Sequence, residues 1–253
     1  IATPPNTHYE LARRALIVGK HVLLEKPPVL NLYQLAELKK IAQERHVSLL
    51  TAFHTRYRNE VTTARDYLQG KKVRNIIISR FQNVQTYHPN AFTNGWILDK
   101  EIGGGGIVID DGSNFIASLS CALGDNIDFE IEKGVLVIPK DMNVETEADV
   151  DFGLSNGASG KLFMKWLHKG VEEAIIRIET DIEGCEIDLL RAEFRVNGEV
   201  KTRGTAGQKR VDISQEYALI YKHLLDLIER GESFVSEKEL KFALDCYQKC
   251  KVT

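Results

Sequence analysis

A short apolar segment that ends abruptly on charged residues and proline constrains the fold of this chain more than any other feature. His21-Val22-Leu23-Leu24 is typical of a buried parallel strand, and Glu25-Lys26-Pro27-Pro28 follows directly. Proline stops the strand and keeps the residue before it extended, so Lys26 is expected at the strand's carboxyl end, where open α/β sheets bind ligands. Half desolvated and beside a carboxylate, Lys26 is a candidate proton-transfer group. The alternative is an ordinary strand-end lysine that points into water.

The segments around this strand alternate between helix and strand patterns. Apolar residues at helical spacing precede it, a second helix pattern follows Asn31, and a second strand is predicted at residues 47–52. This alternation predicts a doubly wound parallel sheet, with residues 1–58 as the C-terminal part of a Rossmann-type domain. The chain opens on Ile1-Ala2-Thr3-Pro4-Pro5, as though at the tail of a strand. We therefore expect about two further βα units, including a glycine-rich phosphate loop, to be missing ahead of it.

From residue 73 onward the pattern changes to short β-rich segments separated by turn signals, which is typical of an antiparallel sheet. The predicted fold class is therefore α/β plus α+β: a partial Rossmann-type parallel sheet domain followed by a large, mostly antiparallel sheet domain. We assign residues 59–234 to a substrate and dimerisation domain, and residues 235–253 to a C-terminal helix packing back on the first domain. A broad sheet with one face uncovered is a candidate surface for a homodimer or homotetramer.

A second unusual stretch is a run of four glycines, Gly103 to Gly106, followed by Asp110 and Asn114. Consecutive glycines weaken regular structure and allow the backbone to come close to a ligand or another chain. If a helix begins near Gly112, Asp110 and Asn114 could face the same space. The alternative is a flexible glycine loop followed by an ordinary helix cap.

Composition excludes several classes of function. The 253 residues suffice for two domains, and the net charge of -3 lacks the basic field that a nucleic-acid or membrane-surface protein needs. No apolar run approaches the ~20 residues of a membrane span, and no signal peptide is visible. The four cysteines are scattered without zinc-ligand spacing, so we expect free thiols in a cytoplasmic protein and no metal site.

Taken together, these stretches resemble the Gfo/Idh/MocA oxidoreductases. The resemblance rests on Thr3-Pro4-Pro5-Asn6-Thr7-His8, on Gly19 to Pro27 and on Gly104 to Gly112, and it runs over essentially the whole chain. It implies an NAD(P)-dependent oxidoreductase in which the lysine and the aspartate lie beside the nicotinamide. The position four residues after the aspartate is usually histidine in that family, and here it is Asn114.

Within the family, Phe53-His54-Thr55-Arg56 and Tyr87-His88-Pro89 look most like the aldose 1-dehydrogenases that oxidise L-arabinose or D-galactose. Those proteins carry a carboxylate where Gln82 aligns. The resemblance implies hydride transfer from C1 of an aldose to the nicotinamide, giving an aldonolactone. Burial lowers the pKa of a lysine and raises that of an aspartate, so either Lys26 or Asp110 could act as the base, and we expect them to share the proton as a coupled pair.

The resemblance also assigns the remaining site residues. Asn114 and His88 are expected to orient sugar hydroxyls, with His54 and Gln82 as further substrate candidates. The cofactor is NAD or NADP, because the residues that distinguish the two belong to the segment expected upstream. Contacts to this cofactor are expected from Thr3, Pro4, Asn6, His8, Glu25, Lys26 and Pro27.

Two other functions remain open from the sequence. The first is an inositol, sugar-alcohol or sugar-phosphate dehydrogenase of the same family. A phosphate would favour two arginines in the pocket, for which only Arg56 and Arg58 offer themselves. The second is a non-catalytic NAD(P)-binding sensor or partner subunit, suggested by the missing histidine.

Overall fold

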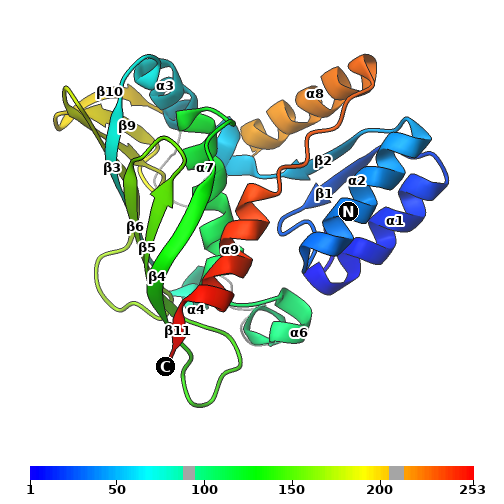
Figure 1. Cartoon of the computed structure of the whole chain (residues 1–253), viewed down its shortest axis with the longest axis horizontal. Coiled ribbons are helices and arrows are strands. Elements are labelled where there is room, and N and C mark those ends of the chain that lie inside the picture. Colours follow the sequence, from blue (N-terminus) through cyan, green and yellow to red (C-terminus); the bar gives the residue numbers. More distant parts are fainter. Residues whose placement is uncertain (88–94, 205–213) are drawn as a thin grey trace.

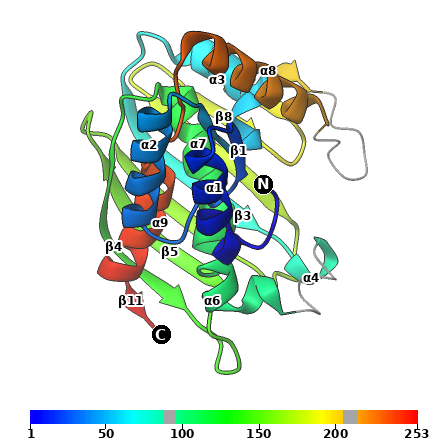
Figure 2. The same ribbon diagram turned by 90° about the vertical axis from the view of Figure 1, so that its right-hand side faces the viewer.

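The computed structural model describes residues 1–87, 95–204 and 214–253, which form a small parallel sheet and a larger mixed sheet (Figures 1 and 2). The predicted fold class is confirmed, and the helices lie close to where their apolar periodicity places them. The strands are β1 (Val22–Glu25), β2 (Leu49–Ala52), β3 (Val73–Phe81), β4 (Phe129–Val137), β5 (Glu147–Leu154), β6 (Ser159–Lys165), β7 (Glu173–Thr180), β8 (Gly184–Asp188), β9 (Glu193–Val196), β10 (Glu199–Arg203) and β11 (Lys251–Val252). The helices are α1 (His8–Ile17), α2 (Leu32–Arg45), α3 (Asn59–Leu68), α4 (Val84–Tyr87), α6 (Lys100–Gly103), α7 (Ser113–Leu123), α8 (Ser214–Arg230) and α9 (Lys238–Lys249), with single turns η1 (Pro5–Thr7), η2 (His54–Tyr57), η3 (Trp96–Leu98) and the π-helical η4 (Val108–Gly112).

The small sheet pairs β1 with β2 in parallel, with Val22 opposite Leu49. Helix α1 buries Ala12 and Leu16, and α2 buries three apolar residues spaced along one face. The side chain of Asn31 accepts a hydrogen bond from the Gln34 N–H at 2.9 Å and so caps α2. This unit holds the end of β1, and with it Lys26, against the rest of the molecule.

The large sheet has the order β10-β9-β8-β7-β3-β6-β5-β4-β11. Most neighbours are antiparallel, but β3 pairs with β6 in parallel and so does β11 with β4. The two edge strands have weak sequence signals, because β10 is mostly exposed and polar and β11 has only two residues. Neither strand carries the alternation of apolar and polar residues that identifies a strand in sequence.

Helices cover only one side of the large sheet. Figures 1 and 2 show α3, α7 and α9 on the side that also faces the small sheet, while the opposite side of β3 to β7 is bare. Helix α7 lies in the middle of this layer, and every residue from Ser113 to Ala122 is buried. A helix buried on all sides needs a mainly apolar sequence, and apart from Asn114 the polar residues of α7 are small serines.

Helix α9 packs mainly against β4 and α7 of the large-sheet unit, where Phe242 lies edge-on against Phe129 and Phe152. The C-terminal segment also reaches the first domain, because Glu239 lies 4.0 Å from Arg56 and Glu237 lies 2.6 Å from Lys39. Before it, the Phe234 N–H donates to the Leu49 carbonyl of the small sheet at 3.0 Å. The expectation that residues 235–253 pack back on the first domain stays a prediction. The boundaries at residues 58 and 234 stay predictions.

The glycine run is packed against the protein itself. Gly104 has a φ of +87°, which only glycine adopts readily, and it forms the C-cap of α6. A Cβ on Gly106 would lie 1.9 Å from the carbonyl oxygen of Glu145. The close approach that the sequence indicated is therefore between two backbone segments of this chain.

We expect Gly106→Ala to destabilise the protein by about 3 kcal/mol, because the Glu145 backbone must move to admit the methyl group. Thermal unfolding measures the loss. Gly112→Ala is the matched control, since the nearest atom to its Cβ would be the Met164 sulfur at an ordinary 3.5 Å. Equal melting temperatures for the two variants would contradict the close approach.

Candidate active site

A cavity of about 750 Å3 lies where the carboxyl end of β1 meets the glycine run and the start of α7. Residues after β1, in η2, on β3 and at the η4–α7 junction line it. Lys26, Asp110 and Asn114, which the sequence placed in two separate constellations, all reach this one space. The structure thus brings the three predicted catalytic residues together.

Lys26 and Asp110 are in direct contact. The Lys26 Nζ donates to the Asp110 carbonyl oxygen at 2.9 Å and forms an ion pair with its carboxylate. The two side chains are 16% and 21% exposed. Burial alone lowers the pKa of Lys26, but the charges of Asp110 and Asp111 outweigh it, so this pKa is raised above its ordinary value. Lys26 is therefore an ammonium at neutral pH, so of the two candidate bases in the expected pair the structure favours Asp110.

Hydrogen bonds with His8 and Glu145 fix the backbone segments that carry Lys26 and Asp110. His8 bridges the carbonyl oxygens of Thr3 and Pro27, each at 2.8 Å, and so ties the first turn of the chain to the segment that carries Lys26. On the other side, the buried carboxylate of Glu145 accepts hydrogen bonds from the N–H groups of Gly106 and Val108 at 3.0–3.1 Å. These contacts fix the approach of the chain to Asp110.

Asn114 lines the cavity and has a buried acceptor without a partner. It lies in the first turn of α7 and its residue surface is 6% exposed. Its backbone carbonyl accepts hydrogen bonds from the hydroxyls of Thr55 and Ser118, each at 3.0 Å, but its side-chain Oδ1 has no partner among the residues described. A buried carbonyl oxygen without a partner is costly, so a ligand hydroxyl or N–H that reaches it is stabilised.

His54 lies on the same wall as an uncharged group. Burial, followed by the positive charges of Lys26 and Arg58, lowers the pKa of His54 to about 4. Its ring stacks on Tyr217 of α8 with centroids 6.3 Å apart. The predicted substrate residue is thus a neutral imidazole at the cavity, able to donate one hydrogen bond and accept another.

The sequence reading missed a cluster around Asp111. One oxygen of its carboxylate, Oδ2, accepts from the Trp166 indole N–H at 3.1 Å, the Arg80 Nε at 3.4 Å and the amide of Gln82. Arg80 and Asp111 line the cavity, whereas Gln82, expected at the substrate, lies buried behind them. The only sequence signal for this cluster was the spacing of Arg80, near the end of β3, and Gln82, just after it, and this spacing says nothing of Asp111.

The predicted cofactor residues divide into two groups. Thr3, Glu25, Lys26 and Pro27 line the cavity, and the Tyr217 hydroxyl donates to the Glu25 carboxylate. The other three predicted cofactor residues do not line the cavity: Pro4 and Asn6 are exposed on the turn, and His8 is buried behind it. His88, which was predicted to contact the substrate, lies outside the described residues.

The two arginines considered for a phosphate are both engaged. Arg56 lies outside the cavity and holds Asp125 through a forked pair of hydrogen bonds at 2.9–3.0 Å. Arg58 does line the cavity, but its Nε lies 2.7 Å from a carboxylate oxygen of Glu60 and 3.7 Å from one of Glu216. Each arginine is therefore already paired with a carboxylate and does not offer a phosphate an unpaired positive charge.

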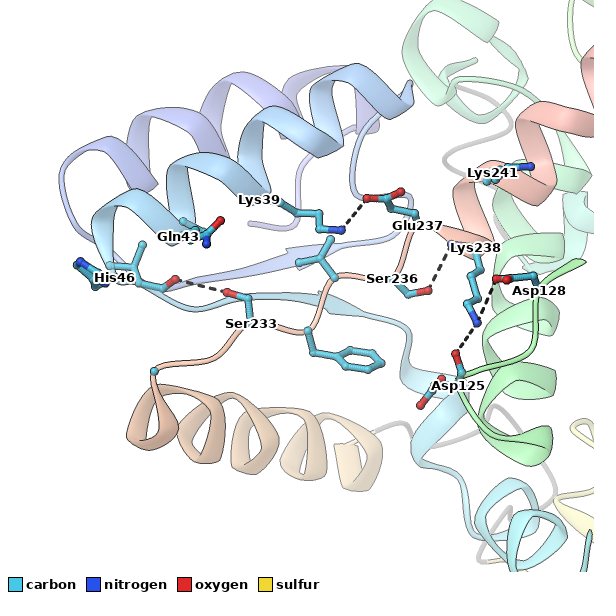
Figure 3. A pocket seen from close by; sticks show the side chains of 15 residues that line it. Lys39, Gln43, His46, Asp125, Asp128, Ser233, Ser236, Glu237, Lys238 and Lys241 are labelled. Atoms are coloured by element: carbon cyan, nitrogen blue, oxygen red, sulfur yellow. Dashed lines mark hydrogen bonds and ion pairs between the residues drawn. The ribbon is translucent and has the colours of Figure 1, made fainter. Parts of the chain in front are cut away.

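A second, larger cavity of about 910 Å3 lies between α2, the segment before α9 and the loop after α7, on another part of the molecule (Figure 3). Ion pairs cross or border it: Lys39 Nζ contacts Glu237 at 2.6 Å, and Lys238 Nζ contacts Asp128 at 3.5 Å. Its lining contains none of the predicted site residues. We therefore assign the chemistry to the smaller cavity.

Two further searches cover only the described residues. Within residues 1–87, 95–204 and 214–253, no three His, Cys, Asp or Glu side chains are grouped as metal ligands. No helix in these ranges is long and apolar enough to cross a membrane.

Comparison with known proteins bears on the family of the chain. Residues 1–53 match the sequence profile of an oxidoreductase family with an NAD-binding Rossmann fold. The chain is 25% identical over 245 residues to a galactose 1-dehydrogenase of Pseudomonas fluorescens, covering 97% of this chain and 74% of that protein. It is 34% identical over 113 residues to oxidoreductase P35 of Formosa agariphila, covering 44% of this chain and only 35% of that protein.

A solved structure gives the same relationship in three dimensions. The crystal structure of a D-galactose 1-dehydrogenase from Rhizobium etli matches with a TM-score of 0.87 and 27% identity, over 99% of this chain and 75% of that one. These matches confirm the family resemblance drawn from the motifs.

The electrostatics of the cavity predict how His54 titrates. Replacing Lys26 by Met removes a neighbouring positive charge, so we expect the pKa of His54 to rise from about 4 while burial keeps it below 6.5. Titration of the imidazole by NMR, assigned with His54→Gln, measures it. Lys20→Met, which removes an exposed lysine, should leave it unchanged. A His54 that titrates near 6.5 in the unaltered protein would contradict the assignment.

Proposed function

We propose, from the premise that this chain is a relative of the Gfo/Idh/MocA oxidoreductases, that the protein oxidises a sugar with NAD or NADP, at C1 of an aldose to give an aldonolactone. The observation that carries the proposal is the contact between Lys26 and Asp110 beside the unpartnered Asn114 oxygen in one cavity. The galactose 1-dehydrogenase relative, which aligns over nearly the whole chain, supports C1 as the position of attack.

The residues around the end of β1 fit a nicotinamide. They lie at the carboxyl end of a parallel strand, the usual ligand position in such sheets, and combine a carboxylate, an ammonium and an exposed backbone turn. Thr3, Glu25 and Pro27 would hold the nicotinamide and its ribose. Bound there, the oxidised nicotinamide supplies the hydride acceptor.

The protonation state of Lys26 determines which group of the pair can accept a proton and which can donate one. Since Lys26 is already protonated, the carboxylate of Asp110 is the group that accepts the proton of the substrate hydroxyl. Lys26 then stabilises the oxygen on which negative charge develops, and it returns a proton if the reaction runs backwards. Because the two groups touch, their titration belongs to the pair and not to either residue alone.

Asn114 and His54 give the substrate its orientation. The unpartnered Asn114 Oδ1 accepts a hydrogen bond from one sugar hydroxyl, and the neutral His54 ring exchanges hydrogen bonds with another. Holding the sugar in this way brings its reacting carbon and hydroxyl into one geometry.

Dehydrogenation of an inositol or a sugar alcohol uses the same groups and remains the rival within this class. A non-catalytic sensor has less support, because it does not need Lys26 held in contact with Asp110.

A screen of aldoses and inositols with NAD+ and NADP+, following the absorbance of the reduced nicotinamide, tests the proposal. Cofactor binding without turnover on any polyol would contradict it.

We expect Lys26→Ala to lower turnover by on the order of 100-fold or more while cofactor binding stays largely intact. Steady-state kinetics and titration with NADH measure the two effects separately. Lys40→Ala is the control, because it removes an exposed lysine from an ion pair with Glu44 on α2. Turnover like that of the unaltered protein in Lys26→Ala would overturn the assigned role.

The bare side of the large sheet supports a homo-oligomer. Phe163 lies there among charged neighbours, and an exposed sheet surface of this breadth suits a two-fold interface. We expect light scattering to give a multiple of 28.5 kDa, and Phe163→Glu to lower it. Val18→Glu, at an apolar residue of α1 that is 68% exposed, is the matched control. A monomer at all concentrations would contradict this arrangement.

A further inference from the structure

We propose that Asp111 binds the substrate directly, accepting a hydroxyl of an uncharged sugar on its Oδ1, and that this selects neutral sugars over phosphorylated ones. The inference rests on the proposed function and deepens it. Asp111 lines the same cavity as Lys26 and Asn114, and its side chain is 17% exposed.

The two oxygens of this carboxylate are used unequally. Every hydrogen bond that the described residues make to Asp111 reaches Oδ2, from Trp166, Arg80 and Gln82. The second oxygen, Oδ1, has none of them. A carboxylate oxygen carries two lone pairs, so Oδ1 has full capacity to accept from a ligand.

The donors that hold Oδ2 are themselves fixed. Trp166 is fully buried and Gln82 is 2% exposed, while Arg80 also donates to the carbonyl oxygen of Glu173 at 3.5 Å. Three donors on one atom leave the carboxylate little freedom to rotate, so Oδ1 keeps one position. An acceptor held in this way loses little entropy when a ligand binds.

The charges around the cavity decide which ligands fit. Each lining cation that the structure describes already faces a carboxylate: Lys26 faces Asp110, Arg58 faces Glu60 and Arg80 faces Asp111. A phosphate would have to displace one of these partners and would meet the others as like charges. An uncharged polyol meets no such repulsion, and its hydroxyl can donate to Oδ1 of Asp111, to which none of the described residues donates.

Asp111→Asn tests direct contact, because it keeps the shape of the side chain and removes the charge. A hydrogen bond to a charged acceptor corresponds to about a 10- to 100-fold effect, so we expect kcat/KM for the best neutral aldose to fall by that factor. With the unaltered protein, we expect one monodeoxy analogue of that aldose to show the same fall in kcat/KM relative to the aldose. With Asp111→Asn, the same analogue and the aldose should have equal kcat/KM. Glu186→Gln is the matched control, since Glu186 is 21% exposed and also holds two arginines, outside the cavity.

A double variant, Asp111→Asn with Gln82→Glu, separates contact from a distant charge effect. It moves the negative charge to a neighbouring buried side chain and so largely preserves the field at Lys26. We expect kcat/KM of the double variant for the neutral aldose to stay as low as that of Asp111→Asn. Full restoration, or an equal loss in Asp111→Asn for every deoxy analogue, would overturn the inference. So would a phosphorylated aldose used better than the neutral one by the unaltered protein.

Sugar binding to the complex with NADH, measured by calorimetry with the same sugars and variants, keeps the two proposals apart. Absence of turnover contradicts the proposed oxidation, whereas the Asp111 inference is judged by the difference in sugar affinity between the protein and Asp111→Asn. Turnover without such a difference in affinity or in kcat/KM overturns the inference alone.

Discussion

The contact between Lys26 and Asp110 is the constraint on which the site depends, because it joins two units of the fold through residues 84 positions apart. An ion pair that excludes most water is stable only where both partners are held in place and their charges are balanced. His8 supplies that support behind Lys26, and Glu145 supplies it behind Asp110. The packing of Gly106 against the Glu145 backbone therefore supports the position of Asp110 as well as the fold.

The cavity carries several charges, and nearly all of them are paired. The carboxylates beside Lys26 raise its pKa, and burial followed by neighbouring positive charges lowers that of His54. Among the residues that the structure describes, Oδ1 of Asn114 and Oδ1 of Asp111 are acceptors without a hydrogen-bond donor. A surface of paired charges with spare acceptors suits a ligand that brings hydroxyl donors and no charge of its own.

Local patterns predicted most of the elements. The strand end at Lys26 follows from proline geometry, the helix after Asn31 from its cap, and the strands of the large sheet from their alternation. Local patterns say less about what each element packs against. Helix α9 packs its aromatic face on strands far away in the sequence, and the exposed strand β10 pairs with the adjacent β9 although most of its residues are polar.

The sequence by itself determined the fold class and the presence of Lys26, Asp110 and Asn114 in motifs, because strand ends, glycine runs and helix starts are local features. Only the tertiary structure decided what these residues do. The raised pKa of Lys26, the burial of Gln82 and the one-sided bonding of Asp111 depend on charges and donors brought from other elements. Electrostatic interaction and hydrogen bonding act through space, so no spacing along the chain reveals them.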